Sequence, residues 1–321
     1  MRGVVWSLLI GGAAGSALAA AASAQDHVKA EKCRDCHPDI YAEWKTSQHS
    51  KAWSDPRFQA ALKVAEEPER CTPCHAPNPI LDAGIGAYPT LRSRYKNEGV
   101  SCVTCHRSGD AYAGPYAAKL MDDVGHYSVE EKAFKDHTLC ATCHGQEKEQ
   151  VHNQVRDYLL GPSAKKGKHC QDCHMPRIVR PAAVNTLDPK KEYPKRPGRK
   201  HVFVGSHDEA MLKKAAKVQV RAEGGKATVT VTNVEVAHAI PAAADRALRV
   251  EIVVTPAVGK PATTLEVWGW DKRLREGQSG TASAPLPAGG GKVVATLWHC
   301  FALDDKREDW AKMTSAEATW R

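Results

Sequence analysis

Five copies of the pattern C-x-x-C-H constrain this chain more than any other feature of its sequence. They lie between residues 33 and 174, and their members are Cys33, Cys36 and His37; Cys71, Cys74 and His75; Cys102, Cys105 and His106; Cys140, Cys143 and His144; and Cys170, Cys173 and His174. Two thiols three residues apart lie on one side of a helical turn, and a histidine follows them directly. Any fold of this chain must therefore arrange five such turns around whatever they bind.

This spacing is typical of the covalent attachment of c-type haem. The two thiols form thioethers with the two vinyl groups of one haem, and the histidine reaches the iron as its proximal ligand. A zinc site would combine cysteine pairs in fours, and it would not explain why every pair is followed by histidine. We therefore predict five covalently attached haems c, with their iron, as the cofactors.

The remaining cysteine and the composition agree with this prediction. Ten of the eleven cysteines belong to the motifs and only Cys300 is left, so we expect no intrachain disulfide. Cys300 is most simply a buried cysteine in a strand, and the alternatives are a functional thiol or an intermolecular bridge. Aromatic residues make up only 6% of the chain, and apolar haem plates would supply the core that they do not.

The formal net charge of +8 does not indicate a nucleic-acid-binding protein. A ferric haem with two neutral imidazoles carries about −1 once its two propionates are counted, so five haems offset most of the excess. The lysines and arginines are then more simply counter-charges for propionates than a binding surface for a polyanion.

Residues 1–24 read as a secretory signal peptide, with Arg2, an apolar stretch and the small-residue cleavage site Ala22-Ser23-Ala24. The alternative is an uncleaved anchor, because about 20 apolar residues can span a bilayer. The first cysteine lies inside a haem motif, so we expect no lipoprotein. We predict export to the periplasm or the cell surface, without stable membrane insertion after cleavage.

Residues 25–181 are predicted to form a pentahaem domain of short helices and irregular chain, including a helix from Ile40 to Trp53. Successive motif histidines are separated by 38, 31, 38 and 30 residues. The alternation gives a period of about 69 residues for every second motif, which indicates a weak internal repeat of haem pairs.

Residues 182–217 are predicted to be a basic, proline-rich linker that carries a distal-ligand segment. The run 189–200 contains three prolines and six basic residues against one glutamate. Such a charge run usually marks a solvated segment, which favours a linker. The alternative is a docking patch for an acidic redox partner.

Residues 218–321 follow a period of two and predict a small antiparallel β-sandwich. The expected strands are 218–222 and 227–232, joined by a Gly224-Gly225 turn, and then 248–255, 264–270 and 293–301, and we expect a helical tail over 304–321. The predicted fold class is thus α+β: a mostly helical haem domain followed by a β-sandwich.

Ten further histidines could supply the second iron ligand: His27, His49, His126, His137, His152, His169, His201, His207, His238 and His299. This number is high for domains of this size, so most are better explained as distal ligands than as surface residues. His169 precedes Cys170 directly and His299 lies in an expected strand, and we expect neither to ligate. Methionine ligation is not favoured, because Met175 directly follows a motif histidine. Low-potential haems with two histidine ligands are the expectation.

The chain resembles the multihaem cytochromes c of the cytochrome c-554 type, some of which carry an appended β-domain. The matching residues are Trp44, Ser47 and His49; Gly114, Pro115 and His126; the run from Cys170 to Pro176; His201, Phe203 and Gly205; and Asn233, His238 and Pro241. The resemblance implies that His49, His126, His201 and His238 are distal iron ligands. The β-domain motif of that family usually reads Gly-His-x-x-Pro-Thr-Gly, whereas Ala237, Ala242 and Ala243 stand here in place of its Gly, Thr and Gly.

The fifth distal position is left to His137, which we place first, or to His207, His152 or His27; otherwise one iron is five-coordinate. Saturated irons relay electrons, whereas an open iron can bind a small molecule.

We predict an electron carrier of respiration rather than an enzyme, with other cytochromes or a quinol-linked donor as partners. A multihaem reductase or oxidase of a small nitrogen or sulfur compound is the alternative. Pentahaem nitrite reductases have lysine in one motif, and all five motifs here end in histidine. The resemblance also implies a homo-oligomer or filament.

Overall fold

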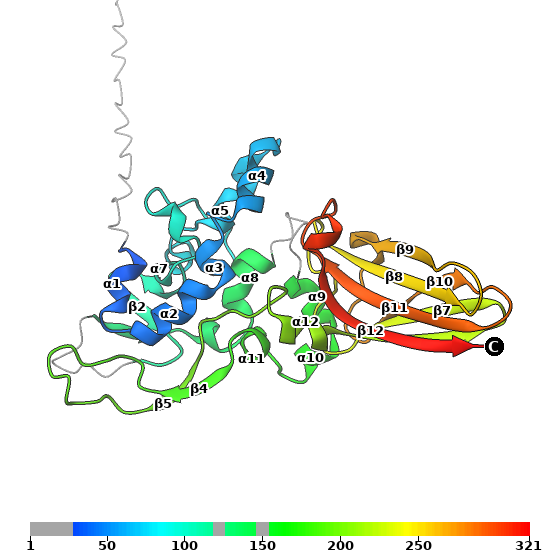
Figure 1. The fold of residues 1–321 in the computed structure, drawn as a ribbon. Helices are drawn as coiled ribbons and strands as arrows, with labels where there is room; N and C mark the ends of the chain where they lie inside the picture. The colour runs from blue at the N-terminus through cyan, green and yellow to red at the C-terminus, as the bar shows by residue number, and fades with distance from the viewer. Residues whose placement is uncertain (1–27, 118–125, 146–153) are drawn as a thin grey trace, which may run out of the picture.

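The computed structural model describes residues 28–117, 126–145 and 154–321. Short helices gather in the N-terminal part of the chain, and β-strands form the C-terminal part (Figure 1). Helices α9, α10 and α12 lie between these two parts (Figure 1). The predicted signal peptide and the candidate ligands His27 and His152 lie outside the described residues.

The helices of the described residues are short. The α-helices are Ala30–Arg34 (α1), Pro38–Thr46 (α2), Gln48–Lys51 (α3), Pro56–Val64 (α4), Thr72–His75 (α5), Ile80–Ala83 (α6), Cys102–His106 (α7), Thr138–His144 (α8), Gln154–Leu160 (α9), Pro162–Lys165 (α10), Cys170–His174 (α11) and Glu209–Ala215 (α12). The 3-10 helices are Pro68–Arg70 (η1), Lys96–Glu98 (η2), Lys132–Lys135 (η3), Trp270–Lys272 (η4) and Arg307–Asp309 (η5). Within the described ranges, none is long and apolar enough to cross a membrane.

The predicted helix from Ile40 to Trp53 is divided at Ser47. This residue has an extended backbone, and its hydroxyl accepts a hydrogen bond from the Ser50 N–H at 3.3 Å. A serine hydroxyl that caps a new helix satisfies an amide that would otherwise lack a partner, so α3 starts where α2 stops. Trp44 is buried, and its indole N–H donates to the Val100 carbonyl at 2.8 Å.

Two small sheets accompany the helices. Strands Arg107–Ser108 (β1), Ala111–Gly114 (β2) and Ser128–Glu130 (β3) form the first. Strands Arg177–Arg180 (β4) and Arg196–Arg199 (β5) pair antiparallel as the second. Part of the expected linker is therefore folded: β5 pairs with β4, and α12 precedes the first long strand.

The C-terminal part consists of two antiparallel sheets, as predicted. Its strands are Ala216–Glu223 (β6), Lys226–Asn233 (β7), Ala247–Pro256 (β8), Ala262–Trp268 (β9), Ser279–Pro285 (β10), Gly291–Cys300 (β11) and Ala311–Trp320 (β12). The sheet orders are β10-β7-β6 and β12-β11-β8-β9. The expected hairpin is present, with Gly224 and Gly225 at positive φ in its turn, a conformation that favours glycine.

The expected helix over 304–321 is wrong, because this segment forms strand β12 along β11. Its alanines, glutamate and lysine favour a helix locally, but pairing with β11 buries Met313 in the core, and tertiary contacts override weak propensity. Leu248, Val250, Ile252 and Leu297, from β8 and β11, are fully buried in the same core. The fold class is α+β.

Candidate haem-binding and iron-ligating site

Each C-x-x-C-H motif lies on a short helix or at its end. Four motif histidines, His75, His106, His144 and His174, are the last residues of α5, α7, α8 and α11. His37 instead follows α1 and directly precedes α2. One helical turn places both cysteines of a motif on the same side, so both sulfurs can reach a single planar group.

Backbone carbonyls orient the rings of four motif histidines. The Nδ1 atoms of His37, His75, His106 and His174 lie 2.6–2.7 Å from the carbonyl oxygens of Ala182, Ala52, Ala113 and Val204, respectively. A carbonyl only accepts, so each Nδ1 carries the proton and donates it. In this tautomer Nε2 is unprotonated, which is the form that binds a metal, and the hydrogen bond also makes the imidazole a stronger ligand.

Four motif histidines face a second histidine from a distant part of the chain. The ring centres are 6.3 Å apart for His37 and His126, 6.2 Å for His144 and His49, 6.1 Å for His106 and His201, and 6.3 Å for His174 and His238. The partners are separated by 64 to 95 residues in the sequence. These second histidines are the four that the resemblance implies as distal ligands.

The ring separations suit one metal between each pair. A metal–imidazole nitrogen bond is about 2.0 Å long, so two imidazoles on opposite sides of one metal have ring centres about 6 Å apart. Two rings in direct van der Waals contact stack more closely, as His75 and Phe58 do at 3.6 Å. The spacing of the four pairs is thus wide for stacking and right for coordination.

Burial keeps three of the second histidines in the neutral form that a metal binds. Desolvation lowers the pKa of His49, His201 and His238 to about 4. For a histidine this direction favours the uncharged ring at pH 7. In addition, the Nδ1 atoms of His201 and His238 lie 3.1 and 2.9 Å from the carbonyl oxygens of Arg199 and Ala239, respectively.

The other candidate histidines of the described residues contact aromatic side chains. The ring of His137 lies 5.4 Å from that of Tyr158, and the ring of His207 stacks on Phe301 at 4.3 Å. His169 also contacts Tyr158, and buried His299 lies beside Phe301. Neither contact involves a motif histidine. The assignment of the fifth distal ligand stays a prediction.

The motif cysteines are neighbours across motifs as well as within them. The side chain of Cys33 lies beside that of Cys102, Cys74 beside Cys143, and Cys140 beside Cys170. The first two of these contacts join residues 69 apart, which is the period seen in the sequence. Burial raises the pKa of the Cys105 thiol to about 11. Cys105 is close enough to Cys140 for its charge to raise the pKa of the Cys140 thiol. The third motif therefore lies near the first and the fourth.

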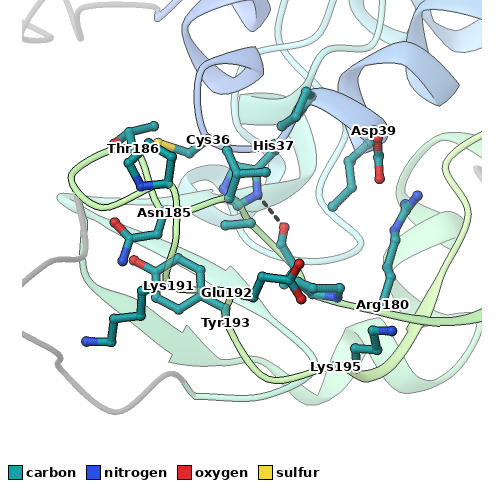
Figure 2. A pocket seen from close by; sticks show the side chains of 17 residues that line it. Cys36, His37, Asp39, Arg180, Asn185, Thr186, Lys191, Glu192, Tyr193 and Lys195 are labelled. Atoms are coloured by element: carbon teal, nitrogen blue, oxygen red, sulfur yellow. Dashed lines mark hydrogen bonds between the residues drawn. The ribbon is translucent and has the colours of Figure 1, made fainter.

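A cavity of about 670 Å³ lies beside the first motif (Figure 2). Cys36 and His37 line it, together with the loop that joins β4 to β5. Two hydrogen bonds hold this loop against the motif. The Val184 N–H donates to the Cys36 carbonyl at 2.7 Å, and Nδ1 of His37 donates to the Ala182 carbonyl. The loop between β4 and β5 therefore lies directly against the first motif.

Paired cysteines on helical turns, oriented histidines and neutral opposing imidazoles are the donor set that c-type haem requires. The fold and this site define a multihaem c-type cytochrome with a C-terminal β-domain, whose cofactor is covalently bound haem c with its iron. The first part of the chain, residues 32–107, matches the family described as cytochrome c554 and c-prime.

The fold of almost the whole chain is shared with a solved cytochrome. The penta-heme cytochrome c552 from Thermochromatium tepidum matches with a TM-score of 0.66 and 20% identity, over 91% of this chain and 99% of that one. A superoxide reductase from Nanoarchaeum equitans matches 33% of this chain and 94% of its own with 18% identity, at a TM-score of only 0.22. No curated protein matches the chain.

Proposed function

We propose that this chain is an exported pentahaem cytochrome that carries electrons along a row of mostly bis-histidine haems. The observation that carries the proposal is the set of four histidine pairs at 6.1–6.3 Å. An iron with two protein ligands has no position left for a substrate, whereas it can still change its oxidation state. The haem supplies the redox chemistry, and the chain supplies ligation, burial and spacing.

In this proposal the ten motif cysteines attach the haems, and His37, His75, His106, His144 and His174 are the proximal ligands. The distal ligands are His126 opposite His37, His49 opposite His144, His201 opposite His106, and His238 opposite His174. His49 comes from α3, directly after the first two helices, but serves the fourth motif. The haems therefore tie together segments that are distant in sequence.

The cysteine contacts support an order for the electron path. Neighbouring sulfurs join the first motif to the third, the fourth motif to the fifth, and the second motif to the fourth. Cys105 of the third motif lies near Cys140 of the fourth. We infer a path from the first haem through the third and fourth to the fifth, with the second haem joined to the fourth.

Electron paramagnetic resonance of the oxidised protein, combined with a nitric oxide titration, tests the proposal. We expect low-spin signals for the haems of the first, third, fourth and fifth motifs, and no change in them when nitric oxide is added. High-spin, ligand-binding iron at any of these four sites would support the rival function, reduction or oxidation of a small nitrogen or sulfur compound.

Single substitutions test the ligand assignments. His238→Ala should convert one haem from low to high spin, because it removes the ligand opposite His174. His207→Ala is the control: its ring lies on Phe301, so the spin state of the four paired haems should not change. Unchanged spectra in the His238 variant would remove the β-domain from haem ligation.

Amino-terminal sequencing of the exported protein tests export, with cleavage after Ala24 as the expected result.

A further inference from the structure

We propose that residues 177–200 form a docking surface for an acidic electron-transfer protein, which exchanges electrons with the haem of the first motif. This inference rests on the proposed function and names the partner that it leaves open. The surface, called here the basic hairpin, consists of β4, β5 and the loop between them, and it projects from the helical part (Figure 1).

The basic hairpin holds most of the excess charge of the chain. It contains eight lysines and arginines against two acidic residues, so its +6 accounts for most of the formal +8. Three of the arginines are paired: Arg180 with Glu43, and Arg177 and Arg199 with Asp172. The other five basic residues are exposed, namely Lys190, Lys191, Lys195, Arg196 and Lys200. Such a concentration of positive charge attracts an acidic surface and speeds its approach.

The same 24 residues expose large apolar side chains. Leu187 is 76% exposed, Val179 65% and Val184 47%. Exposed apolar side chains among charged ones are the usual composition of a protein–protein interface. Charge alone would also suit a polyanion or propionate counter-ions, but neither needs exposed Leu187 and Val179. The combination therefore favours a protein partner.

The loop of the basic hairpin lies beside the first haem motif. It lies on Cys36 and His37, and Lys191 and Lys195 line the cavity beside this motif (Figure 2). A partner seated on the loop would lie beside the first haem. Through Cys33 and Cys102, the first motif adjoins the third, so an electron that enters here reaches the proposed path at one end.

Three exposed basic residues of the basic hairpin lie outside the cavity. Lys190, Arg196 and Lys200 are exposed and do not line the cavity, whereas Arg180, Lys191 and Lys195 do. The test variant therefore carries Lys190→Glu, Arg196→Glu and Lys200→Glu. The matched control carries Lys214→Glu, Lys217→Glu and Lys226→Glu, which change the same charge at exposed positions at the end of α12 and on β6 and β7.

The measurement is stopped-flow reduction of the full-length haem-loaded protein by a reduced plant-type ferredoxin, a strongly acidic protein. We expect the second-order rate constant of wild type to fall steeply with salt, because ions screen the attraction. The hairpin variant should react about tenfold more slowly at low salt and show a weaker salt dependence, which is the scale of electrostatic steering. The control variant should keep the wild-type rate within about twofold.

Other outcomes overturn the inference. Equal rates in all three proteins, or equal slowing in both variants, would show that the hairpin has no special role. Sedimentation with phosphatidylserine vesicles is the second arm: wild-type binding that the hairpin variant alone loses, together with unchanged ferredoxin rates, would assign the surface to a membrane instead.

A small reductant separates this inference from the proposed function. Dithionite should reduce the haems of wild type and both variants alike, since it does not need the docking surface. If dithionite reduces all three proteins and ferredoxin shows no dependence on the hairpin, the docking surface fails and the carrier function stands. If the haems of wild type are high-spin and bind nitric oxide, the carrier function itself fails.

Discussion

At the scale of single residues, Cys300 behaves differently from the other ten cysteines. It is fully buried at the end of β11, and burial raises the pKa of its thiol above the usual value. A thiol reacts as its thiolate, so both its burial and its raised pKa protect Cys300. The motif cysteines lie on short helices where both sulfurs of a pair can reach one haem. One residue type thus serves packing at one position and covalent attachment at ten others.

We predict that Cys300 is the only thiol that can be titrated. With Ellman's reagent, the native haem-loaded protein should show no fast-reacting thiol, and the protein in guanidinium should show one per chain, because the other ten sulfurs are thioethers. A Cys300→Ala variant is the control and should show none. A count above one in guanidinium contradicts complete attachment of the haems.

At the scale of elements, α2 is held to two later segments by Glu43. Its carboxylate accepts two hydrogen bonds from Arg180 of β4, each of 2.7 Å, and a third from the backbone N–H of His201 at 2.9 Å. Burial alone would raise the pKa of Glu43, but the hydrogen bonds from Arg180 and His201 outweigh it and lower the pKa. The ionised carboxylate therefore connects the first helices, the basic hairpin and a proposed iron ligand.

We predict that Glu43→Gln lowers the free energy of unfolding at pH 7 by about 2 kcal/mol, the scale of a charged hydrogen-bond group. Because the pKa of Glu43 is lower in the folded state than its ordinary 4.5, its stabilisation is complete above about pH 4.5. The stabilisation is lost as the pH falls through the folded value. The measurement is guanidinium unfolding of both proteins from pH 7 to pH 3.

The difference between wild type and Glu43→Gln should therefore shrink below about pH 4.5. Glu31→Gln is the matched control, because its ion pair with Arg34 is exposed. Such a pair contributes at most about 1 kcal/mol. If the stability difference between wild type and Glu43→Gln grew towards acid pH, it would contradict a lowered pKa of Glu43 in the folded protein.

At the scale of the whole molecule, polar contacts fix the β-domain to the segment of α9 and α10. Buried Asp157 of α9 forms ion pairs with Arg273 and Arg275. Glu276 accepts hydrogen bonds from the backbone N–H and the hydroxyl of Ser163. His238 extends from the same domain to His174, so these contacts position the proposed distal ligand of the fifth haem.

We predict that Asp157→Asn costs about 2 kcal/mol of unfolding free energy, because it removes the charge from a buried side chain that accepts a hydrogen bond from Arg275. The looser domain should also release His238 in part, which appears as a new high-spin fraction in the paramagnetic resonance spectrum. Asp271→Asn, at an exposed position of η4, is the control for both measurements. If this variant loses stability while its haems stay fully low-spin, the ion pairs of Asp157 attach the domain without controlling ligation by His238.

Local pattern was enough for the repeating parts of the fold. Alternation over 218–232 predicted the β6–β7 hairpin, and the paired glycines predicted its turn. The same reasoning failed at β12, where helix-favouring residues are held in a strand by β11. It also joined α2 and α3, because the capping role of Ser47 depends on one hydroxyl rather than on periodicity.

The motifs alone determine that the chain carries covalent haem, because attachment needs only two thiols and one histidine within five residues. Nothing in their spacing says which imidazole faces which iron. His49 follows the first motif yet faces His144 of the fourth, and His126 lies beyond the third yet faces His37 of the first. These partners are 95 and 89 residues apart, respectively, and packing of the intervening helices and strands brings them together. Proximal ligation is a property of local sequence, whereas distal ligation is a property of the folded chain.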